Sequence, residues 1–288
     1  MTLTRDTITE YQQRYGLSYH VPHALDAAEI VGLRDKIVVE IGGSLPERFV
    51  RDAFGVRGWI AIEELSYWQE IEASGGVQGS PPGAVARRLD TATAADIESG
   101  YGVFAGRIEA LPAALDGRFD AAFSIAAFEH INTLALTLDG AWRALRPGGC
   151  LFSLFSPIWS AHDGHHLPSI RDRSGRGFDF TNAPVPPWGH LLLRPPELFG
   201  HLLAHTDRQT AAEMVYYIYH SPHINRLFTE DYIAYCRASP FAVERCDLVF
   251  PLAPPPDIQR ELERRHPCRT HFTNGGLLVV LRKPGGTS

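Results

Sequence analysis

Lysine is almost missing from this chain of 288 residues. Lys36 and Lys283 are the only two, and arginine supplies the rest of the 27 basic residues. A Schiff-base enzyme needs a lysine amine in its site, and a Walker-type phosphate loop needs Gly-Lys followed by Ser or Thr. Both lysines adjoin apolar runs that predict strands, so neither class of enzyme is expected.

Paired cysteines and long apolar runs are missing too. The four cysteines form no Cys-x-x-Cys pair, which favours reduced thiols over a disulfide framework or a zinc site. No apolar run approaches the ~18 residues of a membrane-spanning helix. The start of the sequence is too polar for a signal peptide, so we expect a cytoplasmic protein with no membrane partner.

The charge balance argues against one class of partner. The chain has 27 basic and 33 acidic residues, a net charge of −6. Sequence-independent binding of nucleic acid needs a basic footprint. We therefore expect a small-molecule substrate and no nucleic acid.

Short apolar runs alternate with helical patterns along the chain. Continuous apolar runs are typical of strands buried on both faces of a parallel sheet, and the alternation indicates βαβ units. The expected strands are residues 36–43, 58–64, 100–106, 119–126, 144–159, 241–250 and 275–283. The expected helices are 6–34 (split near Pro22), 46–54, 127–145, 212–228, 229–239 (capped by Thr229) and 257–266. The fold class is therefore α/β, with a doubly wound, mostly parallel, seven-stranded sheet.

The pattern divides the chain into four parts. We expect an N-terminal helical segment (1–35), a cofactor-binding core (36–159), an inserted lid after the fifth strand (160–228) and a C-terminal completion of the sheet (229–288). Residues 75–83 read as a loop by their glycine and proline content. Eight of the 13 histidines fall in the lid, where they could serve proton chemistry.

A glycine turn and a distant carboxylate suggest a nucleoside site. The first strand ends in V-V-E-I-G-G-S-L-P, where glycines let a ligand approach backbone N–H groups at the start of a helix. Glu63 follows Gly42 by 21 residues, at the end of the second strand, where a carboxylate can accept both ribose hydroxyls. The full G-x-G-x-x-G fingerprint is absent, which argues against a nicotinamide or flavin dinucleotide.

Four motifs in order resemble a known family. The segments VVEIGGS, IAIEE, GRIEALPAALDGRFDAAFSIAAFEHI and ALRPGGCLFSLF look like those of class I S-adenosylmethionine-dependent methyltransferases. The resemblance covers about residues 36–156, with a weaker echo at 229–283, and implies a Rossmann-like methyltransferase fold that binds S-adenosylmethionine.

The resemblance also implies roles for individual residues. They fall into groups for the methionine part (Glu40, Gly42, Gly43, Ser44), the ribose (Glu63), the adenine (Arg107, Ile108) and the floor beneath the sulfonium (Ser124, Ile125). The sequence departs from the family pattern in two places. Ser44 stands where the family has a third glycine, and Arg107 stands where it often has aspartate, unless Glu109 accepts from the adenine amine.

The histidines that follow the fifth strand have three readings. His162, His165 and His166 start close to the expected methyl group, and Asp163 could orient one of them as a general base. They could also bind a metal, or simply hydrogen-bond to the backbone of a loop. His130, in the EH pair, is either a base or a packing residue. We predict His162, His165, His166 and His130 as the catalytic candidates and assign no metal ligand.

The predicted function is methyl transfer from S-adenosylmethionine to oxygen or nitrogen of a small molecule in secondary or specialised metabolism. A first alternative uses the sulfonium without methylating an acceptor, as an intramolecular cyclase or lyase. A second is a degenerate binding protein, in which the aromatic stretch 212–228 forms a homodimer contact. A nicotinamide-linked oxidoreductase is the least favoured alternative because the glycine fingerprint is incomplete.

Overall fold

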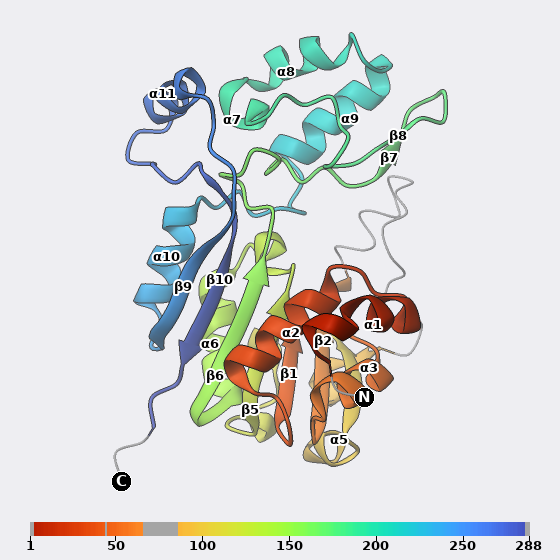
Figure 1. Ribbon diagram of the computed structural model, residues 1–288, viewed down its shortest axis with the longest axis vertical. Helices are drawn as coiled ribbons and strands as arrows, with labels where there is room; N and C mark the ends of the chain where they lie inside the picture. The colour runs from red at the N-terminus through yellow and green to blue at the C-terminus, as the bar shows by residue number, and fades with distance from the viewer. Residues whose placement is uncertain (1–2, 44, 66–85, 286–288) are drawn as a thin grey trace.

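The structure is a computed structural model that describes residues 3–43, 45–65 and 86–285. Within these residues the main sheet has eight strands in the order β3-β4-β2-β1-β5-β6-β10-β9 (Figure 1). All neighbours pair in parallel except β10, which is antiparallel to β6 and β9. The strands are β1 (Ile37–Ile41), β2 (Gly58–Glu63), β3 (Arg87–Arg88), β4 (Tyr101–Ala105), β5 (Phe119–Ile125), β6 (Leu145–Phe155), β9 (Ala242–Pro251) and β10 (Asn274–Arg282). The predicted α/β class is confirmed, and the short β3 adds an edge strand to the seven expected.

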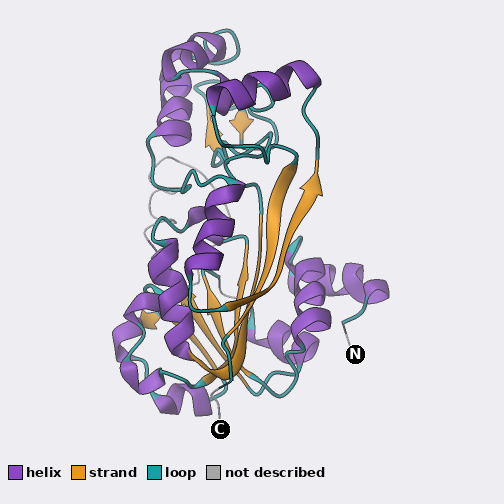
Figure 2. Ribbon diagram, turned by 90° about the vertical axis from the view of Figure 1, so that its left-hand side faces the viewer, coloured by secondary structure: helices purple, strands orange, loops and turns teal. Residues whose placement is uncertain are grey.

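Helices cover both faces of this sheet (Figure 2). The first face carries α1 (Ile8–Tyr15), α2 (His20–Val31) and α3 (Glu47–Phe54), and the second carries α6 (Leu134–Ala144) and α10 (Thr229–Ala238). The remaining helices are α5 (Ala94–Glu98), α7 (Gly189–Leu192), α8 (Pro195–Leu202), α9 (Arg208–Tyr219) and α11 (Pro256–Arg265). None of the helices described is long and apolar enough to cross a membrane.

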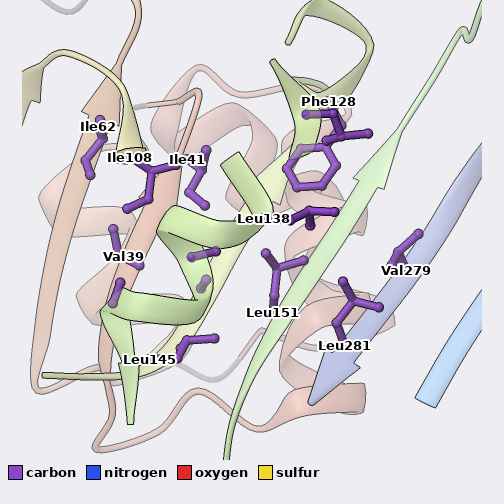
Figure 3. Close-up of a cluster of buried hydrophobic side chains, with 14 of the residues drawn as sticks. Val39, Ile41, Ile62, Ile108, Phe128, Leu138, Leu145, Leu151, Val279 and Leu281 are labelled. Carbon is purple, nitrogen blue, oxygen red and sulfur yellow. The ribbon is translucent and has the colours of Figure 1, made fainter. Parts of the chain in front are cut away.

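The alternation of side chains along each strand explains the two layers. Val38 belongs to the buried cluster under α1–α3, whereas the next residue, Val39, belongs to the cluster under α6 (Figure 3). Trp59 and Ile60 divide in the same way on β2. Successive strand residues point to opposite faces, so a continuous apolar run supplies both cores at once.

Three local predictions need correction. The N-terminal helices are separated at Gly16–Tyr19 and not near Pro22, which lies in the first turn of α2, where a missing N–H leaves no helical bond unmade. Thr229 is the first residue of α10 and its hydroxyl bonds Ser160 and Asn274, so Phe228 holds the cap position. The loop predicted at 75–83 lies outside the described residues.

Residues 157–228, here called the cover, lie beyond the carboxyl ends of the parallel strands together with α11 (Figure 1). The cover contains α7, α8, α9 and a small hairpin of β7 (Ile170–Arg171) and β8 (Gly177–Phe178). It has its own buried cluster, to which Leu262 and Phe272 contribute from the chain between β9 and β10. The expected helix at 212–228 ends at Tyr219, and its residues Met214 and Ile218 are buried in this cluster.

Candidate functional site

A cavity of about 1170 Å³ lies between the carboxyl ends of the strands and the cover. Its walls come from the turns after β1, β2, β4 and β5, from the first loop of the cover, and from residues 15–23, which span the end of α1, the following loop and the first turn of α2. Ligand pockets in proteins are typically about 300–1,000 Å³. The cavity is therefore slightly larger than this range.

The turn after β1 can be formed only with glycine. Gly42 has a φ of +76°, and a β-carbon there would collide with the methyl group of Ala127. A β-carbon on Gly43 would lie 2.6 Å from Oε1 of Glu40. Both positions leave bare backbone facing the cavity, as a ligand lying against the turn requires.

Glu40 fastens this turn from inside the sheet. Its Oε2 accepts hydrogen bonds from the indole N–H of Trp59 at 2.7 Å and from the backbone N–H of Leu45 at 3.0 Å. Burial nevertheless raises the pKa of Glu40 to about 8. Both donors hold the carboxyl group in place, so Glu40 positions the turn as well as lining the cavity.

Acidic side chains follow the ends of β2 and β4. Glu63 is 5% exposed and lines the cavity at the end of β2. Its neighbour Glu64 forms an ion pair with Arg107, so the arginine that stands in place of an aspartate is already engaged. Ile108 packs in the core beneath α6 and also reaches the cavity.

Glu109 presents an unused acceptor to the same end of the cavity. Its Oε1 accepts a hydrogen bond from the hydroxyl of Thr133 at 3.1 Å. Its Oε2 is buried and has no hydrogen-bond partner within the described part of the chain. A buried carboxylate oxygen without a donor is costly, which suits a position completed by a ligand N–H.

Ser124 and Ile125, the two cofactor contacts predicted on β5, point to opposite faces of the strand. Ile125 lines the cavity. Ser124 does not; it is fully buried, and its hydroxyl donates to the carbonyl of Ile41 at 2.8 Å, which joins β5 to the end of β1. Ser44, the remaining predicted cofactor contact, lies outside the described residues.

Of the four predicted histidines, His130 and His166 line the cavity, and their rings meet edge to face at 4.6 Å. His165 packs against His190 instead, and its Nδ1 accepts from the N–H of Leu167 at 3.2 Å. Nδ1 of His162 lies 3.3 Å from Oδ1 of Asp163. The contact lacks hydrogen-bond geometry, since this Oδ1 has no hydrogen-bond partner among the described residues. The structure therefore brings together two of the four.

Several lining groups escape the sequence pattern. Glu129 is fully buried beside His130, and burial raises its pKa to about 8. Tyr19, at the end of the loop between α1 and α2, and His20, the first residue of α2, also line the cavity. Although 49% of Tyr19 is exposed, desolvation of its hydroxyl and then the charge of Glu129 raise its pKa to about 12. The EH pair was a visible signal for Glu129, whereas nothing local marks Tyr19.

Comparison with known proteins agrees with the motifs. Residues 81–153 match the methyltransferase domain family, and no curated protein sequence matches the chain. The chain is thus similar to the methyltransferase domain over this segment, which contains the third of the four motifs and most of the fourth.

Three solved structures are similar at low identity. One is an S-adenosylmethionine-dependent methyltransferase from Mesorhizobium loti (17% identity, TM-score 0.45, 92% of this chain and 98% of that chain). Another is a chain of the Haloferax volcanii complex between the Trm112 methyltransferase activator and a candidate methyltransferase (15% identity, TM-score 0.46, 97% of this chain and 95% of that chain). The third is a candidate histamine N-methyltransferase from Thermotoga maritima (16% identity, TM-score 0.43, 97% of this chain and 93% of that chain). Similarity at this level says nothing about the activity of this chain.

Proposed function

We propose that this chain, which carries a methyltransferase-domain match over residues 81–153, transfers the methyl group of S-adenosylmethionine to oxygen or nitrogen of a small molecule. One observation carries the proposal: a single cavity is lined by a glycine turn, by carboxylates that follow strand ends and by several histidines. Its volume of about 1170 Å³ accommodates a cofactor and an acceptor together.

The described residues fit the cofactor at the sheet edge. The bare turn at Gly42 and Gly43 would receive the methionine part, and Glu63 would accept from the ribose hydroxyls. Glu109 would accept from the adenine amine through its unpartnered Oε2, in the role that Arg107 cannot play because it bears the wrong charge. When bound, S-adenosylmethionine supplies a methyl group on an already activated sulfonium.

The protein's own contribution is placement. The cover closes the cavity over the strand ends and keeps water away, so that a nucleophile can be held in line with the methyl group. A hydroxyl or ammonium acceptor must also lose a proton. Among the predicted histidines, His130 and His166 lie where they can touch such an acceptor, while His162 and His165 lie outside the lining. Burial lowers the pKa of His130 to about 4, so its imidazole is neutral and a weak base.

Titration calorimetry with S-adenosylhomocysteine tests the cofactor end. Glu63→Gln removes the charged acceptor and should weaken binding by roughly 10- to 100-fold, the worth of a hydrogen bond to a charged group. Glu98→Gln is the matched control, because Glu98 is exposed on α5 and outside the cavity lining. Unchanged affinity in Glu63→Gln would contradict the assignment.

Product analysis separates the alternatives. Methyl transfer releases S-adenosylhomocysteine, whereas an intramolecular cyclase or lyase would leave methylthioadenosine. A chain that binds neither cofactor nor product would be a binding protein, as in the second alternative. Met214 and Ile218 are buried inside the cover, whereas Tyr216 on the other side of the same helix is 48% exposed and could take part in a dimer contact.

A further inference from the structure

Three side chains at the cover end of the cavity form a compact cluster. Glu129, His130 and His166 each offer one ligand atom, and these atoms all lie within 4.8 Å of one another. Glu129 and His130 follow β5, and His166 comes from the first loop of the cover. All three residues line the cavity.

Glu129 lacks a counterpart for its charge. The residue is fully buried, and neither carboxylate oxygen has a hydrogen-bond partner among the residues that the structure describes. A buried carboxyl group in this state needs either a proton or a cation.

The two imidazoles are oriented like metal ligands. Nδ1 of His130 donates to the carbonyl of His223, and Nδ1 of His166 makes a long contact of 3.4 Å with the carbonyl of Pro157. A carbonyl can only accept, so each Nδ1 carries the hydrogen and each Nε2 keeps its lone pair. Bonds of this kind fix the tautomer and ring direction of metal-binding histidines.

A second set of contacts holds the cluster together. His223 receives the hydrogen bond of His130 and donates from its own Nε2 to the carbonyl of His166 at 2.8 Å. His166 itself has a φ of +41°, in a region that residues with a side chain rarely occupy. Backbone strain of this kind gathers at functional sites, where the surrounding structure must maintain it.

We propose that Glu129, His130 and His166 bind one divalent first-row transition-metal ion, with Zn²⁺ as the best fit, at the acceptor end of the cavity. Two imidazoles and one carboxylate suit zinc and its neighbours, whereas Mg²⁺ and Ca²⁺ prefer oxygen ligands. Ligands about 2.1 Å from a tetrahedral centre lie about 3.4 Å apart, so the side chains must close by no more than about 1.4 Å. Three protein ligands leave a position that faces the cavity.

One consequence rests on the proposed function. A cation at this place would bind the oxygen or nitrogen of an acceptor and ease the loss of its proton. It would thereby do what the weakly basic imidazoles cannot do alone. Metal binding itself stands apart from that consequence and is measured without cofactor.

The test is titration of the metal-free full chain with Co²⁺, followed by visible absorbance, and with Zn²⁺, followed by calorimetry. We expect one site per chain, at least 10-fold weaker in Glu129→Gln and in His166→Asn. Glutamine keeps the shape of Glu129, and asparagine tolerates the left-handed backbone of His166. The control is His201→Ala with His205→Ala, since these rings lie 5.0 Å apart away from the cavity and could bind metal adventitiously.

Two results would overturn the proposal. One is the lack of Co²⁺ and Zn²⁺ binding by the unaltered chain. The other is binding that survives Glu129→Gln and disappears with the two surface histidines. Zn²⁺ should also raise the Tm of the unaltered chain but not that of either cluster variant, which separates lost binding from lost folding. Binding of S-adenosylhomocysteine to the metal-free chain is scored separately, so failure of one proposal leaves the other standing.

Discussion

The two ends of the cavity are built by different means. At the sheet edge, Gly42, Glu63 and Glu109 each stand within a few residues of a strand end, and the parallel pairing of β1, β2 and β4 brings them together. At the cover end, Glu129 also follows a strand end, that of β5, but Tyr19 comes from the loop between α1 and α2 and His166 from the first loop of the cover. Backbone topology fixes the first end, whereas the packing of loops fixes the second.

The largest expected effect breaks the sheet-edge end. In Gly42→Ala the new methyl group collides with Ala127 and the residue must keep a φ of +76°, so the turn has to move. We expect the affinity for S-adenosylhomocysteine to fall by ~100-fold or more, because the bare backbone of this turn is the contact proposed for the methionine part of the cofactor. Calorimetry measures the loss.

Gly32→Ala is the control for backbone strain alone. Gly32 has a φ of +67°, and no heavy atom of the described residues lies within 4 Å of the added carbon. This variant should lose about 1–2 kcal/mol of stability but keep its affinity. Equal affinity losses in the two variants would show that strain, and not the shape of the turn, is responsible.

A smaller effect concerns adenine. If Oε2 of Glu109 accepts from the adenine amine, the chain should prefer S-adenosylhomocysteine over its inosine analogue by roughly 10-fold. Glu109→Ala should abolish this preference, and Thr133→Val, which removes only the donor to Oε1, should keep it. A preference that persists in Glu109→Ala would place the adenine elsewhere.

The third prediction concerns pH and stability. Burial raises the pKa of Glu40 from 4.5 to about 8, so the folded chain keeps a proton that the unfolded chain loses. The stability from this group is complete below about pH 4.5 and is lost as the pH rises toward 8. The Tm of the unaltered chain should therefore fall relative to that of Glu40→Gln by several degrees between pH 5 and pH 8. A constant difference between the two chains would contradict the raised pKa.

The smallest expected effect sharpens the independence of the two ends. His166→Asn should leave the affinity for S-adenosylhomocysteine within about 2-fold, because the contacts of His166 are with the carbonyl of Pro157 and the ring of His130. Glu63→Gln should in turn leave Co²⁺ binding unchanged. A tenfold fall in cofactor affinity in His166→Asn would mean that the two ends are coupled.

The sequence was most informative where function follows a strand end. Gly42, Glu63 and Ile125 lie on the cavity because the order of strand, turn and helix is local. Ser124 points away from the cavity and bonds the carbonyl of Ile41, whereas its neighbour Ile125 lines the cavity. Side chains alternate between the faces of a strand, and only the assembled sheet tells which of two neighbours meets the cavity.

The cover could not be deduced in the same way. His165 and His166 are adjacent, yet the first packs against His190 and the second faces the cavity, because the turn between them depends on packing partners. The sequence marks Glu129 only as the first residue of the EH pair and indicates no role for it. Its importance comes from complete burial, which no spacing in the sequence expresses.

The separate buried cluster of the cover has a consequence for motion. Trp188, Leu198 and Met214 pack with one another and with Phe272, apart from the two clusters that flank the sheet. A region with its own core can open as a cooperative unit while the rest of the domain stays folded. The backbone amides of the cover should then exchange hydrogen faster than those of the main sheet and its helices. Local opening of the cover would then admit and release ligands while the sheet and its helices stay folded.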